Sequence, residues 1–434
     1  MVPIPSKCRE SKVKYPAHWG GKEAKPPRSR ACRGVLIPFI QTLLADVPSA
    51  TELSLYIHIP FCITKCAYCA FFSKSGENHA TLHNFTIHLL EELQQMTARR
   101  TQPYKTVFIG GGNPGCLEYQ DLQAIVEVVC SQGKPDEFTI EMNPESLRED
   151  IFPLFGQGIT RLSIGLQSMQ EKHLSMLGRN ASLSDNLRAL KSAILIRKRY
   201  GTYLNFDLMT CIPGQGIEDA MRDIEVLVQE AQPEHISLYS LTIEEGSKLA
   251  EMVGFKTFNP LGETQQAEIL ETCWNVLAAL GYEHYEVSNF SKSGADCQHN
   301  LRYWNLQPYV GLGPSAVGTV VTPHGLVRWT GKSSIHDYIS TPAFSSYSME
   351  KLSSDEEITE YLLVSLRTKQ GIDKSSFAQR FNRSFDEMFG RCIKKIQRSN
   401  PIWILDNPVS FSLTEQGWMV MDAIVLDMVL DAGL

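Results

Sequence analysis

The sequence contains no uninterrupted apolar run of the roughly 18 residues that a membrane-spanning helix needs. Its longest apolar stretch, residues 420–430, is interrupted by Asp422 and Asp427. It also has no recognisable secretory leader, although it holds eleven cysteines. Because free cysteines persist in reducing compartments, these absences predict a cytoplasmic protein.

An excess of positive charge is confined to the N-terminus. Residues 1–34 hold nine Lys or Arg and two Asp or Glu, whereas the whole chain carries a net charge of −7. The remaining 400 residues are therefore strongly acidic, which argues against a nucleic-acid partner. We expect residues 1–50 to be a flexible basic extension and lead-in. A translation start placed too far upstream is the alternative.

Paired zinc-type cysteine motifs are also missing. Cys62, Cys66 and Cys69 stand in one C-x3-C-x2-C loop, directly after the alternating strand predicted for residues 54–59. A zinc site normally needs four ligands, and a disulfide would leave one cysteine over. Three thiolates suit a [4Fe–4S] cluster whose fourth iron stays open to an exogenous molecule. The pattern favours this cluster, with zinc and incidental cysteines as alternatives.

The first half of the chain alternates between strands and helices. The predicted strands are 54–59, 106–109, 138–142, 161–166, 203–209 and 235–241, and the predicted helices are 82–98, 122–130, 147–155, 185–199 and 217–231. Such alternation predicts an α/β fold with a parallel sheet and right-handed crossovers. Six units are too few for a closed eight-stranded barrel. Residues 51–285 are therefore predicted to form a partial (β/α)6 barrel of the TIM type, with its site at the C-terminal strand ends.

The cysteine spacing after YIHIPF resembles that of the radical S-adenosylmethionine (SAM) superfamily. The resemblance implies that the methionyl amino and carboxylate groups of SAM occupy the open iron, and that cluster reduction cleaves SAM to a 5′-deoxyadenosyl radical. Asn113 departs from the usual threonine, and a purely structural role is the alternative for every single residue. The cofactor-binding positions implied are Tyr56, Tyr68, Gly111, Gly112, Asn113, Glu141, Gln167, Arg179 and Asp207.

A second motif, HNLRYW, follows Cys297 and Gln298. It resembles the HNxxYW element of the heme chaperone family HemW, which sits beside the oxygen-independent coproporphyrinogen III oxidases. The resemblance implies that His299 is a heme ligand and that Tyr303 and Trp304 provide flat apolar walls. An ordinary loop with a core histidine is the structural alternative.

Phe71 stands where the oxidases carry a further cysteine, so the sequence favours a heme chaperone. Its implied partners are heme, a heme-acceptor protein such as a membrane-associated respiratory enzyme, and an electron donor for the cluster. Radical decarboxylation of coproporphyrinogen propionates is the alternative function. A diverged radical enzyme is a third hypothesis, because Asn180 and Val317 depart from the family pattern.

Residues 286–434 are predicted to form a C-terminal domain that includes the HNLRYW segment. Its expected elements are helices at 354–367, 374–381, 385–398 and 415–430, with a hairpin at 403–405 and 409–413. Helices combined with a hairpin indicate a small α+β, winged-helix-like module. The acidic charge favours a lid or a protein-docking surface over DNA binding.

Overall fold

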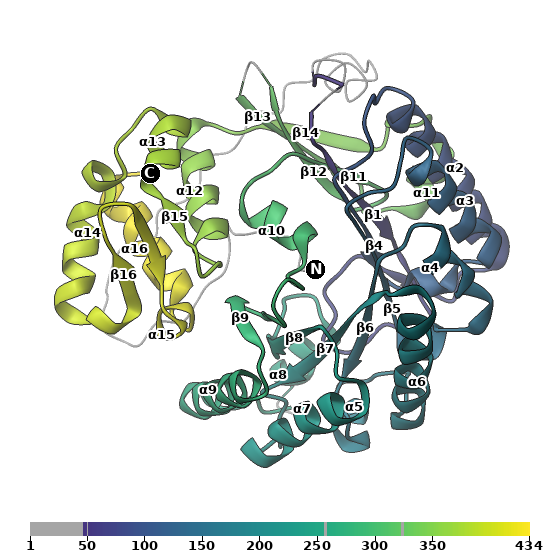
Figure 1. Cartoon of the computed structure of the whole chain (residues 1–434), viewed down its shortest axis with the longest axis horizontal. Coiled ribbons are helices and arrows are strands. Elements are labelled where there is room, and N and C mark those ends of the chain that lie inside the picture. Colours follow the sequence, from purple (N-terminus) through teal and green to yellow (C-terminus); the bar gives the residue numbers. More distant parts are fainter. Residues whose placement is uncertain (1–46, 50, 256–257, 323–324) are drawn as a thin grey trace.

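The computed structural model describes residues 47–49, 51–255, 258–322 and 325–434. A curved sheet, covered by helices on its outer side, forms most of the molecule, and a smaller domain stands beside one end of it (Figure 1). The predicted basic extension lies outside the described residues, except for residues 47–49. None of the helices in the described ranges is both long and apolar enough to cross a membrane.

Six parallel strands form the centre of the sheet and confirm the predicted partial barrel. Each strand pairs in parallel with the next one along the chain. Most of their apolar residues belong to the main hydrophobic core and are almost completely buried. The strands are β1 (Ser54–Ile59), β4 (Thr106–Gly111), β5 (Glu137–Met142), β6 (Arg161–Gln167), β7 (Tyr203–Thr210) and β8 (His235–Ser240).

The helices that cover these strands follow the predicted order. They are α2 (His79–Thr97), α3 (Tyr119–Cys130), α4 (Pro153–Gln157), α6 (Leu183–Tyr200) and α7 (Ile217–Ala231). The single helix expected at 147–155 is wrong, because the chain forms a 3₁₀ turn, Glu149–Ile151, before α4 begins at Pro153. Proline has no backbone N–H, so it fits the first turn of a new helix and not the interior of a longer one.

The sheet continues on both sides of the six parallel strands. β11 (Tyr309–Leu312) pairs in parallel with β1, and β12 (Val317–Thr322), β13 (Gly325–Gly331) and β14 (Tyr347–Lys351) extend it in antiparallel fashion. β10 (Asn289–Ser291) and β9 (Glu283–Glu286) extend the edge beyond β8. Because these strands belong to the barrel sheet, we propose a domain boundary after Lys351 in place of the boundary at residue 286.

The C-terminal domain has a hydrophobic core of its own, built around Phe377, Phe385, Phe389 and Phe411. It consists of α12 (Ser354–Ser365), α13 (Lys374–Phe381), α14 (Phe385–Ser399), α15 (Glu415–Trp418), α16 (Met421–Ala432) and a small sheet of β15 (Ile372–Asp373), β17 (Ser410–Leu413) and β16 (Ile404–Asp406). The predicted helices and hairpin are all present, although the helix expected at 415–430 divides into α15 and α16. This arrangement agrees with a small winged-helix-like module.

Candidate functional site

Cys62 is the last residue of β2 (Phe61–Cys62), and Cys66 and Cys69 lie in the loop between β2 and β3 (Lys74–Ser75), beyond the C-terminal end of β1. The middle of this loop is held from two sides. The backbone N–H of Ala67 donates to Leu177 O at 3.1 Å, and the Leu249 N–H donates to Ala67 O at 2.8 Å. The loops that follow β6 and β8 thus fix the position of the cysteine loop.

The three thiols of the cysteine loop are half-buried and lie near one another. Burial, together with the nearby thiols of Cys69 and Cys66, raises the pKa of Cys62 to about 12. Within the described ranges, no three His, Cys, Asp or Glu side chains converge as ligands of one ion. In a cubane each thiolate binds a different iron, so its cysteine sulfurs surround the cluster without meeting at one point.

A half-buried carboxyl group near the end of β5, Glu141, and a buried one in β7, Asp207, stand beside this loop. Burial raises the pKa of Glu141, and the nearby Asp207 raises it further, whereas the Gly111 N–H lowers it. Burial also raises the pKa of Asp207, whose Oδ1 accepts a hydrogen bond from Asn205 Nδ2 at 2.8 Å. The structure therefore brings together two acceptors suited to the hydroxyl and amino groups of a ligand.

Arg179 and Gln167 approach the same space from β6 and the loop after it. Arg179 Nη1 donates to Cys66 Sγ at 3.4 Å, and Nη2 donates to Gly165 O at 2.6 Å. Tyr68 lies beside this guanidinium, and burial strongly raises the pKa of its phenol. Gln167 has a φ of +67° at a bulge in β6, which turns its amide toward Gly165.

Glycine is required at positions 111 and 112 by the close approach of β1. Gly111 has a φ of +106°, and a Cβ there would lie 2.3 Å from His58 Nδ1. A Cβ on Gly112 would lie 2.5 Å from Phe61 O. The Gly112 N–H donates to Ile59 O at 2.8 Å, so this segment also ties β4 to the start of the cysteine loop. Contact of either glycine with SAM stays a prediction.

Asn113 directs its side chain toward the protein. Its Oδ1 accepts hydrogen bonds from the N–H groups of Gly115 (3.2 Å) and Asn143 (3.3 Å), and its Nδ2 donates to Ser146 Oγ at 2.5 Å. These contacts fasten the end of β4 to the end of β5. They satisfy the amide internally, so they give no support to the prediction that Asn113 binds the cofactor.

His58 is a residue of this region that the sequence analysis did not single out. Tyr56 OH donates to His58 Nδ1 at 2.9 Å, and His58 Nε2–H donates to Phe72 O at 2.9 Å. Burial lowers the pKa of His58 to about 4, which keeps the ring neutral. The alternation of residues in β1 could have indicated this role for His58, since Tyr56 and His58 are two residues apart and share one face of the strand.

The HNLRYW segment lies at the other end of the barrel. It forms α10 (Gln298–Trp304), and His299 Nδ1 lies 2.8 Å from the hydroxyl of Thr106, the first residue of β4. At about 3.3 Å per strand residue, the five residues from Thr106 to Gly111 span roughly 17 Å. The structure therefore brings the predicted SAM residues together but keeps His299 apart from the cysteine loop.

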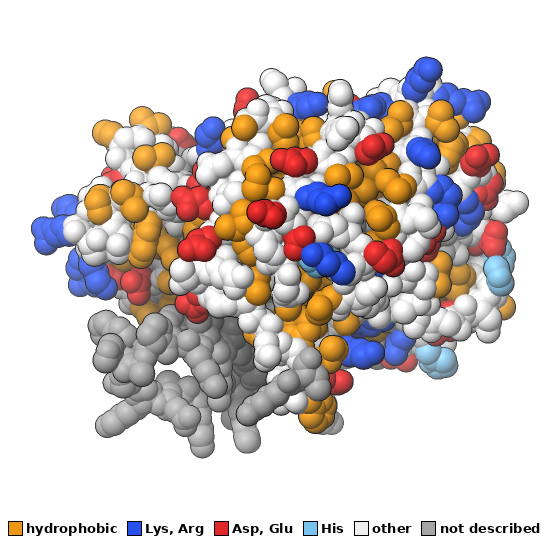
Figure 2. Space-filling view, turned by 90° about the horizontal axis from the view of Figure 1, so that it is seen from below, with side chains coloured by type: hydrophobic (Ala, Val, Ile, Leu, Met, Phe, Trp, Pro, Cys, Tyr) orange, Lys and Arg blue, Asp and Glu red, His pale blue; other side chains and the backbone are white. Residues whose placement is uncertain are grey.

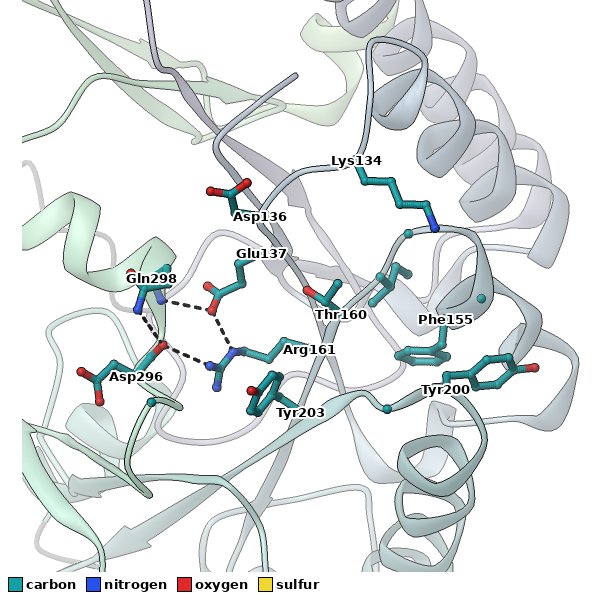
Figure 3. Close-up of a pocket in the computed structure, with 15 residues that line it drawn as sticks. Lys134, Asp136, Glu137, Phe155, Thr160, Arg161, Tyr200, Tyr203, Asp296 and Gln298 are labelled. Carbon is teal, nitrogen blue, oxygen red and sulfur yellow. Dashed lines mark hydrogen bonds and ion pairs between the residues drawn. The ribbon is translucent and has the colours of Figure 1, made fainter. Parts of the chain in front are cut away.

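A glutamate from the barrel caps the start of α10. Glu137 accepts a hydrogen bond from the N–H of His299 at 2.9 Å. It also accepts hydrogen bonds from the N–H of Gln298 at 3.1 Å and from Arg161 Nε at 3.1 Å (Figure 3). Arg161 also donates to the carbonyl oxygen of Asp296. A groove of about 490 Å³ opens beside this pair, lined in part by Tyr203. No local sequence pattern indicates the roles of Glu137 and Arg161.

The aromatic residues of the motif face two different regions. The ring centroids of Tyr303 and His299 lie 5.0 Å apart, and those of Phe108 and His299 lie 5.6 Å apart. Trp304 instead joins the core of the C-terminal domain, where the Arg367 guanidinium lies 4.7 Å from its ring centroid. Tyr303 and Trp304 were the predicted aromatic walls, whereas the rings that contact His299 in this structure are those of Tyr303 and Phe108.

Comparisons with known proteins agree with this architecture. Residues 56–227 match the model of the radical SAM superfamily, and residues 352–420 match that of the HemN C-terminal domain. The chain is similar in fold to coproporphyrinogen III oxidase (HemN) from Escherichia coli, with a TM-score of 0.74, 18% identity, and coverage of 91% of this chain and 94% of that one.

Three relatives align over most of their length. Heme chaperone HemW of Buchnera aphidicola subsp. Acyrthosiphon pisum is 31% identical over 78% of this chain and 88% of its own. Heme chaperone HemW of Escherichia coli is 36% identical over 65% and 74%. Radical S-adenosyl methionine domain-containing protein 1, mitochondrial, of Mus musculus is 32% identical over 76% of each chain. The chain therefore belongs to the radical SAM superfamily and, within it, to the HemW family.

Proposed function

We propose that this protein binds heme and hands it to an acceptor protein in a reducing, cytoplasmic compartment. Cys62, Cys66 and Cys69 hold a [4Fe–4S] cluster, and the residues around Glu141 and Asp207 hold SAM. When bound, the cluster and SAM supply one-electron chemistry at the C-terminal strand ends. The relatives named heme chaperone HemW support the heme function.

The observation that carries the heme proposal is the state of His299. The Thr106 hydroxyl donates to Ser54 Oγ, so its oxygen accepts the Nδ1–H of His299. This leaves the Nε2 lone pair, which has no hydrogen-bond partner among the described residues. Burial and the nearby Arg302 lower the pKa of His299 to about 3. A neutral imidazole with one nitrogen anchored by a hydrogen bond is the form that ligates iron.

Access to this nitrogen requires a movement of the protein. His299 is fully buried where α10 packs on β4, beside Thr106 and Phe108. Exposing its Nε2 therefore needs α10 to move away from β4. Because Trp304, on the same helix, packs into the C-terminal core, we expect that movement to be coupled to a movement of the C-terminal domain.

A heme titration tests the proposal. His299→Ala should weaken heme binding at least tenfold and remove the Soret band of the histidine-ligated complex. His336→Ala is the matched control, because the His336 side chain is 87% exposed. Both variants are compared at matched thermal stability and iron content. Unchanged heme affinity and spectrum in a folded His299→Ala protein would remove His299 from the site.

The relatives that align with most of this chain favour the heme function over the oxidase alternative, because they are named heme chaperone HemW. Incubating the reconstituted protein with SAM, reductant and coproporphyrinogen should therefore give no protoporphyrinogen, and its appearance would overturn the chaperone proposal.

A further inference from the structure

Arg179 is the charged neighbour of one particular cysteine. Its Nη1 donates to Cys66 Sγ at 3.4 Å, while Nη2 is fixed by Gly165 O at 2.6 Å and Asn143 Oδ1 at 3.3 Å. Lys65, the cation nearest in sequence, instead donates to Phe71 O at 3.1 Å. Of the hydrogen bonds in the described part of the chain, the one from a charged donor to Cys62, Cys66 or Cys69 comes from Arg179.

The chain is shaped to bring Arg179 to this position. Gly178 has a φ of +63°, and a Cβ there would lie 3.2 Å from the Cβ of Ala67, so the backbone before Arg179 packs directly on the cysteine loop. The Ala67 N–H also donates to Leu177 O at 3.1 Å.

One donor of the same guanidinium is left over. Arg179 Nε is buried and has no hydrogen-bond partner among the residues that the structure describes. An unsatisfied buried donor destabilises the folded state, so this position favours an incoming acceptor. The guanidinium therefore has one edge on a cysteine sulfur and another available to an anionic group.

We propose that Arg179 sets the reduction potential of the cluster by donating to the Cys66 thiolate, and that a carboxylate ligand at the open iron competes for the same guanidinium. Reduction adds one electron, delivered by a low-potential one-electron donor, and breaks no bond. A cationic donor at the sulfur stabilises the added negative charge and raises the potential. When a carboxylate draws the guanidinium away, the potential falls.

The inference rests on the proposed function, because it needs the [4Fe–4S] cluster. A redox titration followed by EPR distinguishes a failure of the inference from an absence of the cluster. Iron and sulfide content are measured first, and their absence in the wild type would refute the cluster itself. With the cluster loaded, Arg179→Gln should lower the midpoint potential, with Arg179→Lys in between. A tenfold change in the reduction equilibrium corresponds to 59 mV for one electron.

The competition has its own readout. Adding SAM should lower the potential of the wild type more than that of Arg179→Gln. Arg188→Gln is the matched control, because Arg188 is exposed and pairs with Asp185 at 2.7 Å; its potential should equal that of the wild type. A loaded Arg179→Gln protein with the wild-type potential would overturn the inference. If Arg179→Gln does not take up the cluster, Arg179→Lys provides the test. A loaded Arg179→Lys protein with the wild-type potential would also overturn the inference, because Arg179 would then act only on structure.

Discussion

At the scale of single residues, His58 holds the C-terminal end of the barrel together. It accepts a hydrogen bond from Tyr56, donates to the carbonyl of Phe72 beyond the cysteines, and packs against Gly111. One imidazole thus links β1, the cysteine loop and the glycine segment of β4. All three contacts depend on the position of the imidazole ring. A neighbouring substitution that shifts the ring should therefore disturb the binding of the cluster.

Gly111→Ala is such a substitution. The new Cβ would clash with His58 in a residue that also needs a positive φ, so we expect a loss of about 3 kcal/mol in the free energy of unfolding. The iron content should fall as well. Gly201→Ala is the control, because Gly201 has a φ of +73° with nothing within 4 Å of its Cβ position, and it should cost only about 1 kcal/mol. Urea denaturation measures both, and equal losses would contradict the clash.

The buried histidines predict a stability that falls in acid. Burial lowers the pKa of His299 to about 3 and that of His58 to about 4, below the ordinary value of 6.5. Below pH 6.5 these histidines therefore bind protons in the unfolded chain but stay neutral in the folded protein. The contribution to the free energy of unfolding that is present above pH 6.5 is lost as the pH falls toward 3–4.

Removing one such histidine should reduce this pH dependence. Between pH 7 and pH 5, His299→Gln should remove about 2 kcal/mol of the wild-type loss in unfolding free energy. Urea unfolding of both proteins at the two pH values measures the difference. If the wild type and the variant lose the same free energy, His299 is not held neutral by the fold.

Much of the candidate site could be predicted at this scale. The cysteine spacing, the carboxylates at strand ends and Arg179 were all recognisable, because residue type and strand position are local properties. The use of Asn113 as an internal clamp was not, since it depends on Ser146 and on the backbone of β5. Nor was the contact of Arg179 with Cys66, which joins residues 113 positions apart.

At the scale of elements, α10 depends on a side chain from another strand. Its N-cap, Cys297, makes no side-chain capping bond, and Glu137 of β5 takes that part. A carboxylate at a helix N-terminus also interacts favourably with the helix dipole. Arg161 neutralises Glu137 within the protein, so the helix that carries His299 is fixed to the barrel by a buried ion pair.

Glu137→Gln should therefore destabilise the protein selectively. It leaves Arg161 without its counter-ion in a buried position, and breaking such a pair costs about 3–5 kcal/mol. Asp136→Asn, one residue away, is the control. Its side chain is 65% exposed and pairs with Lys105, so it should change stability by less than about 1 kcal/mol. Chemical denaturation gives both values, and similar effects would show that the cap contributes little.

Element boundaries were predictable where the signals were local. The strand–helix alternation gave all six parallel strands, and α7 begins and ends at the predicted residues. β11 was not predictable as a barrel strand, because its parallel pairing with β1 joins segments more than 250 residues apart. The same pairing brings the HNLRYW segment under the barrel, which local patterns could not reveal.

At the scale of the whole molecule, β9 and the residue that follows it contact the C-terminal domain just beyond α12. The Val287 N–H donates to Arg367 O and the Lys369 N–H donates to Tyr285 O, both at 3.0 Å. Arg367 also covers Trp304 and lies 3.9 Å from the buried carboxylate of Glu286. This one side chain therefore contacts both the barrel edge and the helix that carries His299.

Replacing Arg367 should make the closed state less stable without unfolding either core. A desolvated cation–π contact contributes about 2 kcal/mol, so Arg367→Ala should speed amide exchange across residues 298–304 roughly 30-fold. Because His299 is reached only when this helix opens, heme should also associate faster.

Arg391→Ala is the matched control, since Arg391 is 78% exposed and pairs with Asp431 within the C-terminal domain. Hydrogen–deuterium exchange and stopped-flow heme binding measure the two effects. Faster exchange without faster heme association would place heme binding elsewhere than beneath α10, whereas unchanged exchange would mean that Arg367 does not hold the domains closed.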